Sequence, residues 1–111
     1  MDIGISIGKE SLTVNVGNPH GAELSHAVKS VVDFGMKFGI DLAKLDIKVL
    51  IPKMVRGVAG CEGGCPSDAR NFVREGFGGF KLSYIEGGIL SAACTLEDGR
   101  PFSVKIFPEF D

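Results

Sequence analysis

Two short runs near the start of the chain alternate between apolar and polar residues. Their apolar members are Ile3, Ile5, Ile7, Leu12, Val14 and Val16. Side chains that recur with a period of two lie on one face of a β-strand, so both runs predict strands with a single buried face. Because a turn-forming break at residues 8–10 separates them, we expect a β-hairpin over residues 2–16.

The spacing of apolar residues then lengthens to three and four, which predicts a helix over residues 22–39 that packs on a sheet. Just before it, Asn18 is a typical N-cap residue and Pro19 suits the first helical position. Gly39 is a typical residue for the end of a helix. Gly35 lies within the helix, where glycine is unfavourable, and indicates close packing against another element.

The middle of the chain predicts a third strand and a second helix. Residues 47–51 form a compact apolar run that ends at Pro52, and we interpret them as a strand because proline cannot donate to a β-ladder. Residues 53–60 show no clear period and are interpreted as a loop or irregular strand. Residues 66–75 predict a short helix with Asp68 in its first turn, where the helix dipole favours a carboxylate.

Three alternating runs follow, at residues 80–84, 89–96 and 102–106, and Asp98-Gly99 between the last two is typical of a β-hairpin. The predicted order is strand, strand, helix, strand, helix and three strands. We therefore expect an α+β fold, a two-layer sandwich with a largely antiparallel five- or six-stranded sheet and two helices on one face. Residues 1–111 carry no linker or repeat and are expected to form a single α+β domain.

Composition narrows the function classes. The chain has 44% hydrophobic residues and a net charge of −2, with no basic stripe, so we expect a globular protein that does not bind nucleic acid. No apolar run approaches the roughly 18 residues of a membrane helix, and we expect no membrane association. The first residues lack the pattern of a signal peptide, which makes a cytoplasmic location the expectation.

Cys61 and Cys65 mark the segment most suited to chemistry. Glu62-Gly63-Gly64 is a flexible spacer between them, and Pro66 fits the first position of the predicted second helix. Cys65 would then lie at the helix N-terminus, where the dipole favours a thiolate. The pair therefore predicts a reversible disulfide, with Cys65 as the attacking thiol and Cys61 as the resolving thiol.

The same thiols also suit a metal. The ion considered is zinc, and its candidate ligands are Cys61, Cys65 and Cys94. His20, His26 or Asp68 would complete a tetrahedral set. An alternative uses the glycines, Ser67 and Arg70 to hold an anion at the helix start. A further alternative is purely structural, since free cysteines are commonly buried and glycine-rich loops commonly just connect elements.

Two function classes follow from these patterns. The first is a thiol-redox or metal-binding module that uses Cys61 and Cys65. The second is a non-catalytic protein-interaction or structural domain that forms a homodimer, whose partner surface would be marked by exposed members of an aromatic group. That group comprises Phe77, Phe80, Phe107 and Phe110. Because no acid–base pair, Ser-His-Asp set or complete cofactor motif is present, we do not expect an enzyme.

Overall fold

The structure is a computed structural model that describes residues 1–17, 22–59, 73–85 and 89–107. These ranges contain five strands, two α-helices of 13 and 16 residues, one 3₁₀-helix and a further helical segment at residues 73–75. In chain order the labelled elements are β1 (Asp2–Ile7), β2 (Glu10–Asn15), α1 (Ala22–Lys37), η1 (Leu42–Leu45), α2 (Ile47–Ala59), β3 (Lys81–Ile85), β4 (Ile89–Thr95) and β5 (Pro101–Phe107). None of the described helices is long and apolar enough to cross a membrane.

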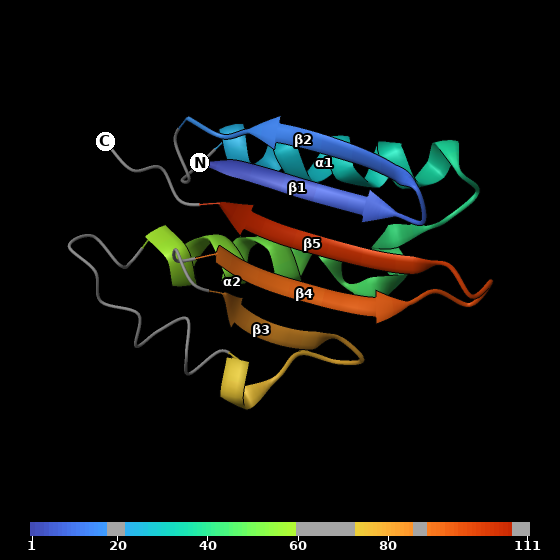
Figure 1. The fold of residues 1–111 in the computed structure, drawn as a ribbon. Coiled ribbons are helices and arrows are strands. Elements are labelled where there is room, and N and C mark those ends of the chain that lie inside the picture. The colour runs from blue at the N-terminus through green and yellow to red at the C-terminus, as the bar shows by residue number, and fades with distance from the viewer. Residues whose placement is uncertain (18–21, 60–72, 86–88, 108–111) are drawn as a thin grey trace.

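The five strands form one antiparallel sheet in the order β2-β1-β5-β4-β3. The first and last strands of the chain lie side by side in its centre, with Ile5 opposite Val104 (Figure 1). The predicted hairpins form between β1 and β2 and between β4 and β5. Their turns contain Gly8 and Gly99, both with positive φ, a backbone conformation that glycine adopts without steric cost.

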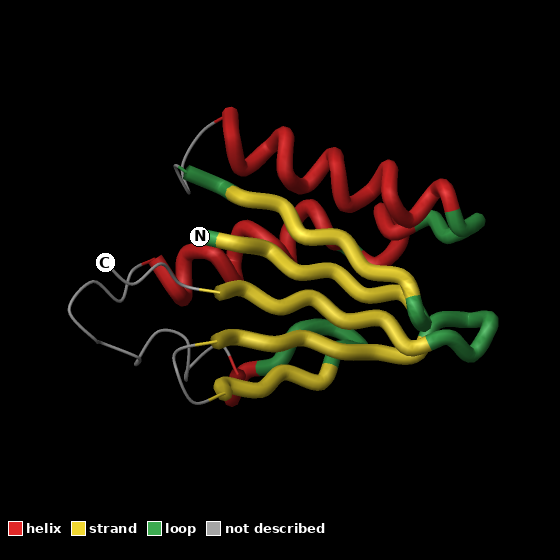
Figure 2. The backbone as a smooth tube through the Cα atoms, turned by 45° about the horizontal axis from the view of Figure 1, so that its top comes forward, coloured by secondary structure: helices red, strands yellow, loops and turns green. Residues whose placement is uncertain are grey.

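Both α-helices cover the same face of the sheet, and Figures 1 and 2 show the resulting two layers. The predicted α+β fold, with a five-stranded antiparallel sheet and helices on one face, is thus confirmed. The two helices run in opposite directions, because η1 turns the chain between the end of α1 and the start of α2. Among the described residues, no helix covers the other face of the sheet.

One predicted element is wrong. Residues 47–51 do not form a strand; they are the first part of α2, which also takes in most of the predicted loop at 53–60. Four buried side chains explain the helix, because they recur at spacings of three, one and three and so lie on one helical face: Ile47, Leu50, Ile51 and Met54. Pro52 lies inside the helix on its outer side, where its ring costs one backbone hydrogen bond but leaves the buried stripe intact.

The predicted second helix at residues 66–75 falls largely outside the described residues. Of that range, residues 73–75 are described and are helical.

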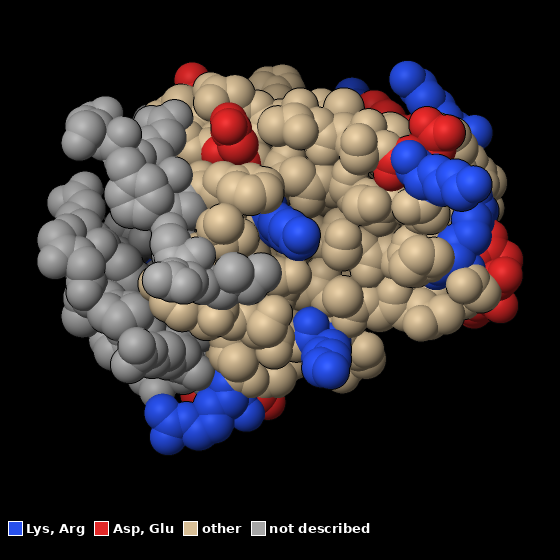
Figure 3. Space-filling model, viewed as in Figure 1, with Lys and Arg blue, Asp and Glu red and all other residues tan. Residues whose placement is uncertain are grey.

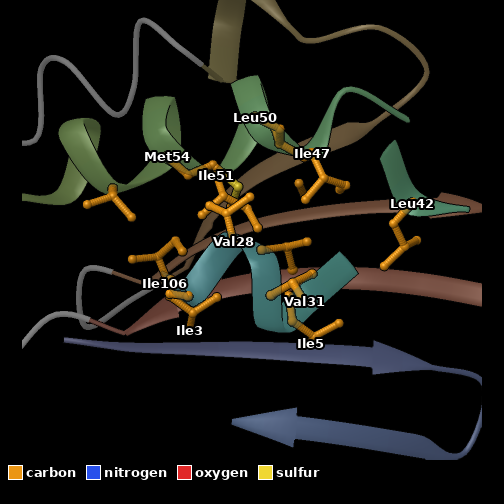
Figure 4. Packing of buried hydrophobic residues seen from close by; sticks show 14 of the residues in the cluster. Ile3, Ile5, Val28, Val31, Leu42, Ile47, Leu50, Ile51, Met54 and Ile106 are labelled. Carbon is orange, nitrogen blue, oxygen red and sulfur yellow. The ribbon is translucent and has the colours of Figure 1, made fainter. Parts of the chain in front are cut away.

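The hydrophobic core fills the space between the helices and one face of the sheet (Figure 4). The central strands contribute Ile3, Ile5, Ile7, Phe102, Val104 and Ile106, and the helices contribute Val28, Val31, Leu50, Ile51 and Met54. Burial of each such side chain contributes about 1.5–3 kcal/mol relative to exposure, which makes this layer the main source of stability. Every residue that alternates with these strand positions therefore points to the opposite side of the sheet.

Candidate functional site

The predicted thiol pair lies outside the described residues. Cys61 and Cys65 belong to the range 60–72, and so do the further candidates Ser67, Asp68 and Arg70; His20 also falls outside the description. The reversible disulfide, the metal site and the anion site at this segment therefore stay predictions.

Cys94 is the one predicted site cysteine that the structure describes. It is opposite Phe102 on β5, so it lies on the helix-facing side of β4, where it is half-buried and unbonded. Burial raises the pKa of the Cys94 thiol, because removal of water disfavours the charged thiolate. A raised pKa favours the neutral thiol and is the opposite of what thiol nucleophiles and metal ligands need.

Cys94 borders a small pocket of about 250 Å³ between η1 and the turn that precedes β3. Asp46 is the single carboxylate that lines it, and the aromatic rings of Phe77 and Phe80 form one side. His26 lies elsewhere, exposed on α1. No three His, Cys, Asp or Glu side chains gather at a possible metal site within the described part of the chain.

The aromatic group is split between the two sides of the sheet. Phe80 packs against the buried Phe102, with ring centroids 6.1 Å apart, and Phe77 is 6.3 Å from Phe80. These two half-buried rings extend the core instead of forming a separate surface patch. Phe107 is on the side of β5 that faces away from the helices, and Phe110 is not among the described residues.

The sheet surface that faces away from the helices is a second candidate site, and we call it the open face. Its described members are Asp2, Gly4, Ser6, Ser11, Thr13, Asn15, Lys81, Ser83, Ile89, Ser91, Ala93, Thr95, Pro101, Ser103, Lys105 and Phe107. Two rows of neighbours cross all five strands in register. One runs Ser11, Ser6, Ser103, Ala93, Lys81, and the other runs Thr13, Gly4, Lys105, Ser91, Ser83.

The open face is unusual because most of its side chains are small and uncharged. The uncovered face of an antiparallel sheet is normally polar, and exposed strands commonly carry charged residues that prevent association. Here the charged members are Asp2, Lys81 and Lys105, and Asp2 accepts a hydrogen bond from Asn15 Nδ2 at 2.7 Å. Figure 3 looks onto this face and shows that many of the described charges lie at the end where the β1–β2 and β4–β5 turns meet.

The ring of Phe107 lies against Gly4 of the neighbouring strand β1. A Cβ atom on Gly4 would be 3.0 Å from Phe107 Cε2, so the ring occupies the space that a side chain at Gly4 would fill. Ser91, in the row that also contains Gly4, is only 7% exposed. Apart from Lys81 and Lys105, the middle of the open face therefore consists of small side chains that another protein surface could approach closely.

The open face is absent from the sites predicted from the sequence, because those predictions rest on the apolar halves of the alternating runs. Its signal is nevertheless present, since apart from Asp2, Lys81 and Lys105 the polar halves of the same runs consist mostly of serine, glycine, threonine and alanine.

Comparisons with protein-family models, with curated proteins and with solved structures find no match to this chain.

Proposed function

We propose that this chain is a protein-interaction domain that works by association, and that its open face pairs with the open face of a second copy. The observation that carries the proposal is the pair of small-residue rows that crosses all five strands. Small side chains, which make up both rows apart from Lys81 and Lys105, allow two sheets to approach closely. A twofold axis would place the same face on both sides, as in most homodimers.

The size of the open face is sufficient for a reversible dimer. Five strands about 4.8 Å apart and about six residues long, at about 3.3 Å per residue, span roughly 500 Å². Two such faces bury about 1,000 Å², which is near the lower limit for a specific interface. Lys81 is on the edge strand β3, so its charged end can extend to the rim of the interface. Lys105 is on the central strand β5, so a dimer must leave room for its ammonium group to reach water.

The test is the oligomeric state of the protein and of Ser103→Glu. Ser103 lies on the central strand β5, in the middle of its row, so in a dimer the substitution adds one carboxylate from each copy to the interface. We expect sedimentation velocity to detect a dimer of the unchanged protein between micromolar and millimolar concentration, and a monomer for Ser103→Glu. The matched control is Ser30→Glu on the exposed side of α1, which should dimerise as the unchanged protein does.

Either of two results would overturn this proposal. One is a monomer at millimolar concentration, which would mean that the open face does not bind a second copy. The other is a dimer of undiminished stability in Ser103→Glu, which would place the interface elsewhere.

A thiol-redox or metal-binding function through Cys61 and Cys65 is our second proposal. It is supported by two thiols that flank Glu62-Gly63-Gly64 directly before Pro66, a spacing compatible with a reversible bond or a shared ion. Metal analysis of protein purified without chelators should detect zinc, or alkylation at graded pH should detect a thiol that reacts well below pH 8. The Cys61→Ser/Cys65→Ser protein should lose that property and still dimerise. Absence of both signals in the unchanged protein would exclude the thiol function.

A further inference from the structure

The outer side of the helical layer contains a groove between α1 and α2 of about 490 Å³. The two helices lie side by side and antiparallel, as Figures 1 and 2 show. Leu24, Val28 and Val32 line the groove from α1, and Pro52 lines it from α2. The volume falls in the range of small-molecule sites, which is about 300–1,000 Å³.

The helical periodicity explains why this groove is apolar. Leu24, Val28 and Val32 are four residues apart, so they form one stripe about 12 Å long on α1. Leu24 and Val32 are only half-buried, although Val28 is almost fully enclosed. An apolar strip therefore remains in contact with water.

Two cations flank the apolar strip, Lys29 on α1 and Lys48 on α2. Neither ammonium group is ion-paired within the described residues. Lys48 also lies in the first turn of α2, a turn without an acidic residue, and there the positive end of the helix dipole makes another positive charge unfavourable. Asp46 directly precedes α2, where its carbonyl oxygen accepts from the backbone N–H groups of Val49 and Leu50, and it already supplies one carboxylate near that helix end. An anion in the groove would pair with Lys29 and Lys48, so the groove combines apolar lining residues with two cations that have no ion-pair partner among the described residues.

We infer that the α1–α2 groove binds a small amphipathic carboxylate, a free fatty acid of medium chain length. Its carboxylate pairs with Lys29 and Lys48, and its alkyl chain lies along the stripe toward Leu24 and Pro52. Charge complementarity selects an acid over a neutral lipid, and the groove volume selects a single alkyl chain over a phospholipid with two. This site is separate from the open face and does not depend on the dimer.

The test uses decanoate as the probe and decanol as its uncharged match, both below the concentration at which they aggregate. We expect isothermal titration calorimetry to detect one decanoate per chain, with decanol at least about tenfold weaker, because a charge-assisted contact is worth about that factor. Amide chemical shifts should change at the groove and not at the open face. Binding should persist in Ser103→Glu, which separates this inference from the proposed dimer.

Three variants complete the experiment. Lys48→Glu should weaken decanoate binding by about tenfold or more. Val32→Trp should block the groove, because an indole ring is much larger than the valine side chain. Lys44→Glu, on η1 and outside the groove, should bind decanoate as the unchanged protein does. Lys48→Glu improves the charge at the start of α2, so a loss of binding in that variant is not a loss of folding.

The inference is overturned if decanoate fails to bind the folded protein, or if decanol binds as tightly as decanoate. It is also overturned if Lys48→Glu and Lys44→Glu lose affinity equally, or if the protein binds vesicles of anionic phospholipid but not the free acid.

Discussion

Gly35 of α1 and Leu42 of η1 are packed so closely that no side chain fits between them. A Cβ atom on Gly35 would lie 2.6 Å from both Cγ and Cδ1 of Leu42, and 3.1 Å from the carbonyl oxygen of Ile40. Leu42 is fully buried. The backbone of α1 thus forms one wall of the pocket that holds this leucine, which is the close approach that a glycine in mid-helix predicts.

Gly35→Ala should therefore destabilise the protein, although alanine favours helices. The helix propensity gain is about 1 kcal/mol, and overpacking against Leu42 costs about 1–3 kcal/mol, so we expect a net loss measured by urea denaturation. Met36→Ala, next along the helix and 60% exposed, is the control and should change stability little.

The same contact permits a double-mutant test. Leu42→Ala removes the two Leu42 atoms that a Cβ at Gly35 would meet at 2.6 Å and leaves the Ile40 carbonyl oxygen at 3.1 Å. In that background Gly35→Ala should therefore cost clearly less than in the unchanged protein. An equal cost in both backgrounds would mean that the Gly35–Leu42 contact is not the cause.

Lys48→Glu should stabilise the free protein. The first turn of α2 contains a lysine and no acid, and exchange of a cation for an anion at that end of a helix gains about 0.3–1 kcal/mol at low ionic strength. Thermal unfolding should show a higher Tm that approaches the Tm of the unchanged protein as salt is added. A lower Tm at low salt would contradict the dipole argument.

Cys94 should react slowly with alkylating agents. Burial raises the pKa of its thiol, so less thiolate is present at any given pH than for an ordinary cysteine. The Cys61→Ser/Cys65→Ser protein isolates this thiol, and its alkylation rate near pH 8 should lie below that of a free cysteine peptide. A faster rate would show that the thiol is activated.

The raised pKa of the Cys94 thiol also affects the stability of the fold at alkaline pH. Because the folded-state pKa of Cys94 lies above the unfolded value of about 8.5, the neutral thiol favours folding below that pH, and this contribution is lost as pH rises through the folded pKa. Cys94→Ala should weaken the loss of stability in this alkaline range, which urea denaturation at graded pH can measure.

Arg100 joins the β4–β5 turn to the end of α1. Its Nη2 donates to the Phe38 carbonyl oxygen at 2.9 Å, and its Nε donates to Asp98 Oδ2 at 2.6 Å. Arg100→Ala should cost about 1 kcal/mol through the lost hydrogen bond to Phe38. Arg100→Lys should recover little, because an ammonium group does not reach both acceptors with fixed geometry.

Asp98 makes this link sensitive to acid. The side-chain hydrogen bond from Arg100 lowers the pKa of the Asp98 carboxyl, and the backbone N–H of Arg100 adds to the effect. A lowered folded-state pKa means that the contribution is present above the unfolded pKa of about 3.9 and is lost as pH falls through the folded value. Asp98→Asn should therefore reduce the acid-induced loss of stability. A loss equal to that of the unchanged protein would show that other groups cause it.

The local pattern of apolar and polar residues was sufficient to predict most of the helices and strands. The alternation at Ile3, Ile5 and Ile7 identified β1 and its buried face, and Asp98-Gly99 identified the β4–β5 turn. The error at residues 47–51 also has a local origin, because a short apolar run fits a strand and a buried helix equally well. Pro52 suggests the end of a strand, although the buried spacing continues to Met54.

By itself, then, the sequence determined which residues are buried, the hairpin turns and the α+β class, because these depend on neighbours along the chain. Only the tertiary structure decided that β1 pairs with β5, which brings Ser6 beside Ser103 and completes the small-residue rows of the open face. It likewise decided that α1 and α2 run antiparallel, which places Lys29 and Lys48 on one groove. These contacts join residues that are distant in sequence, and no local periodicity encodes which surfaces meet when the core closes.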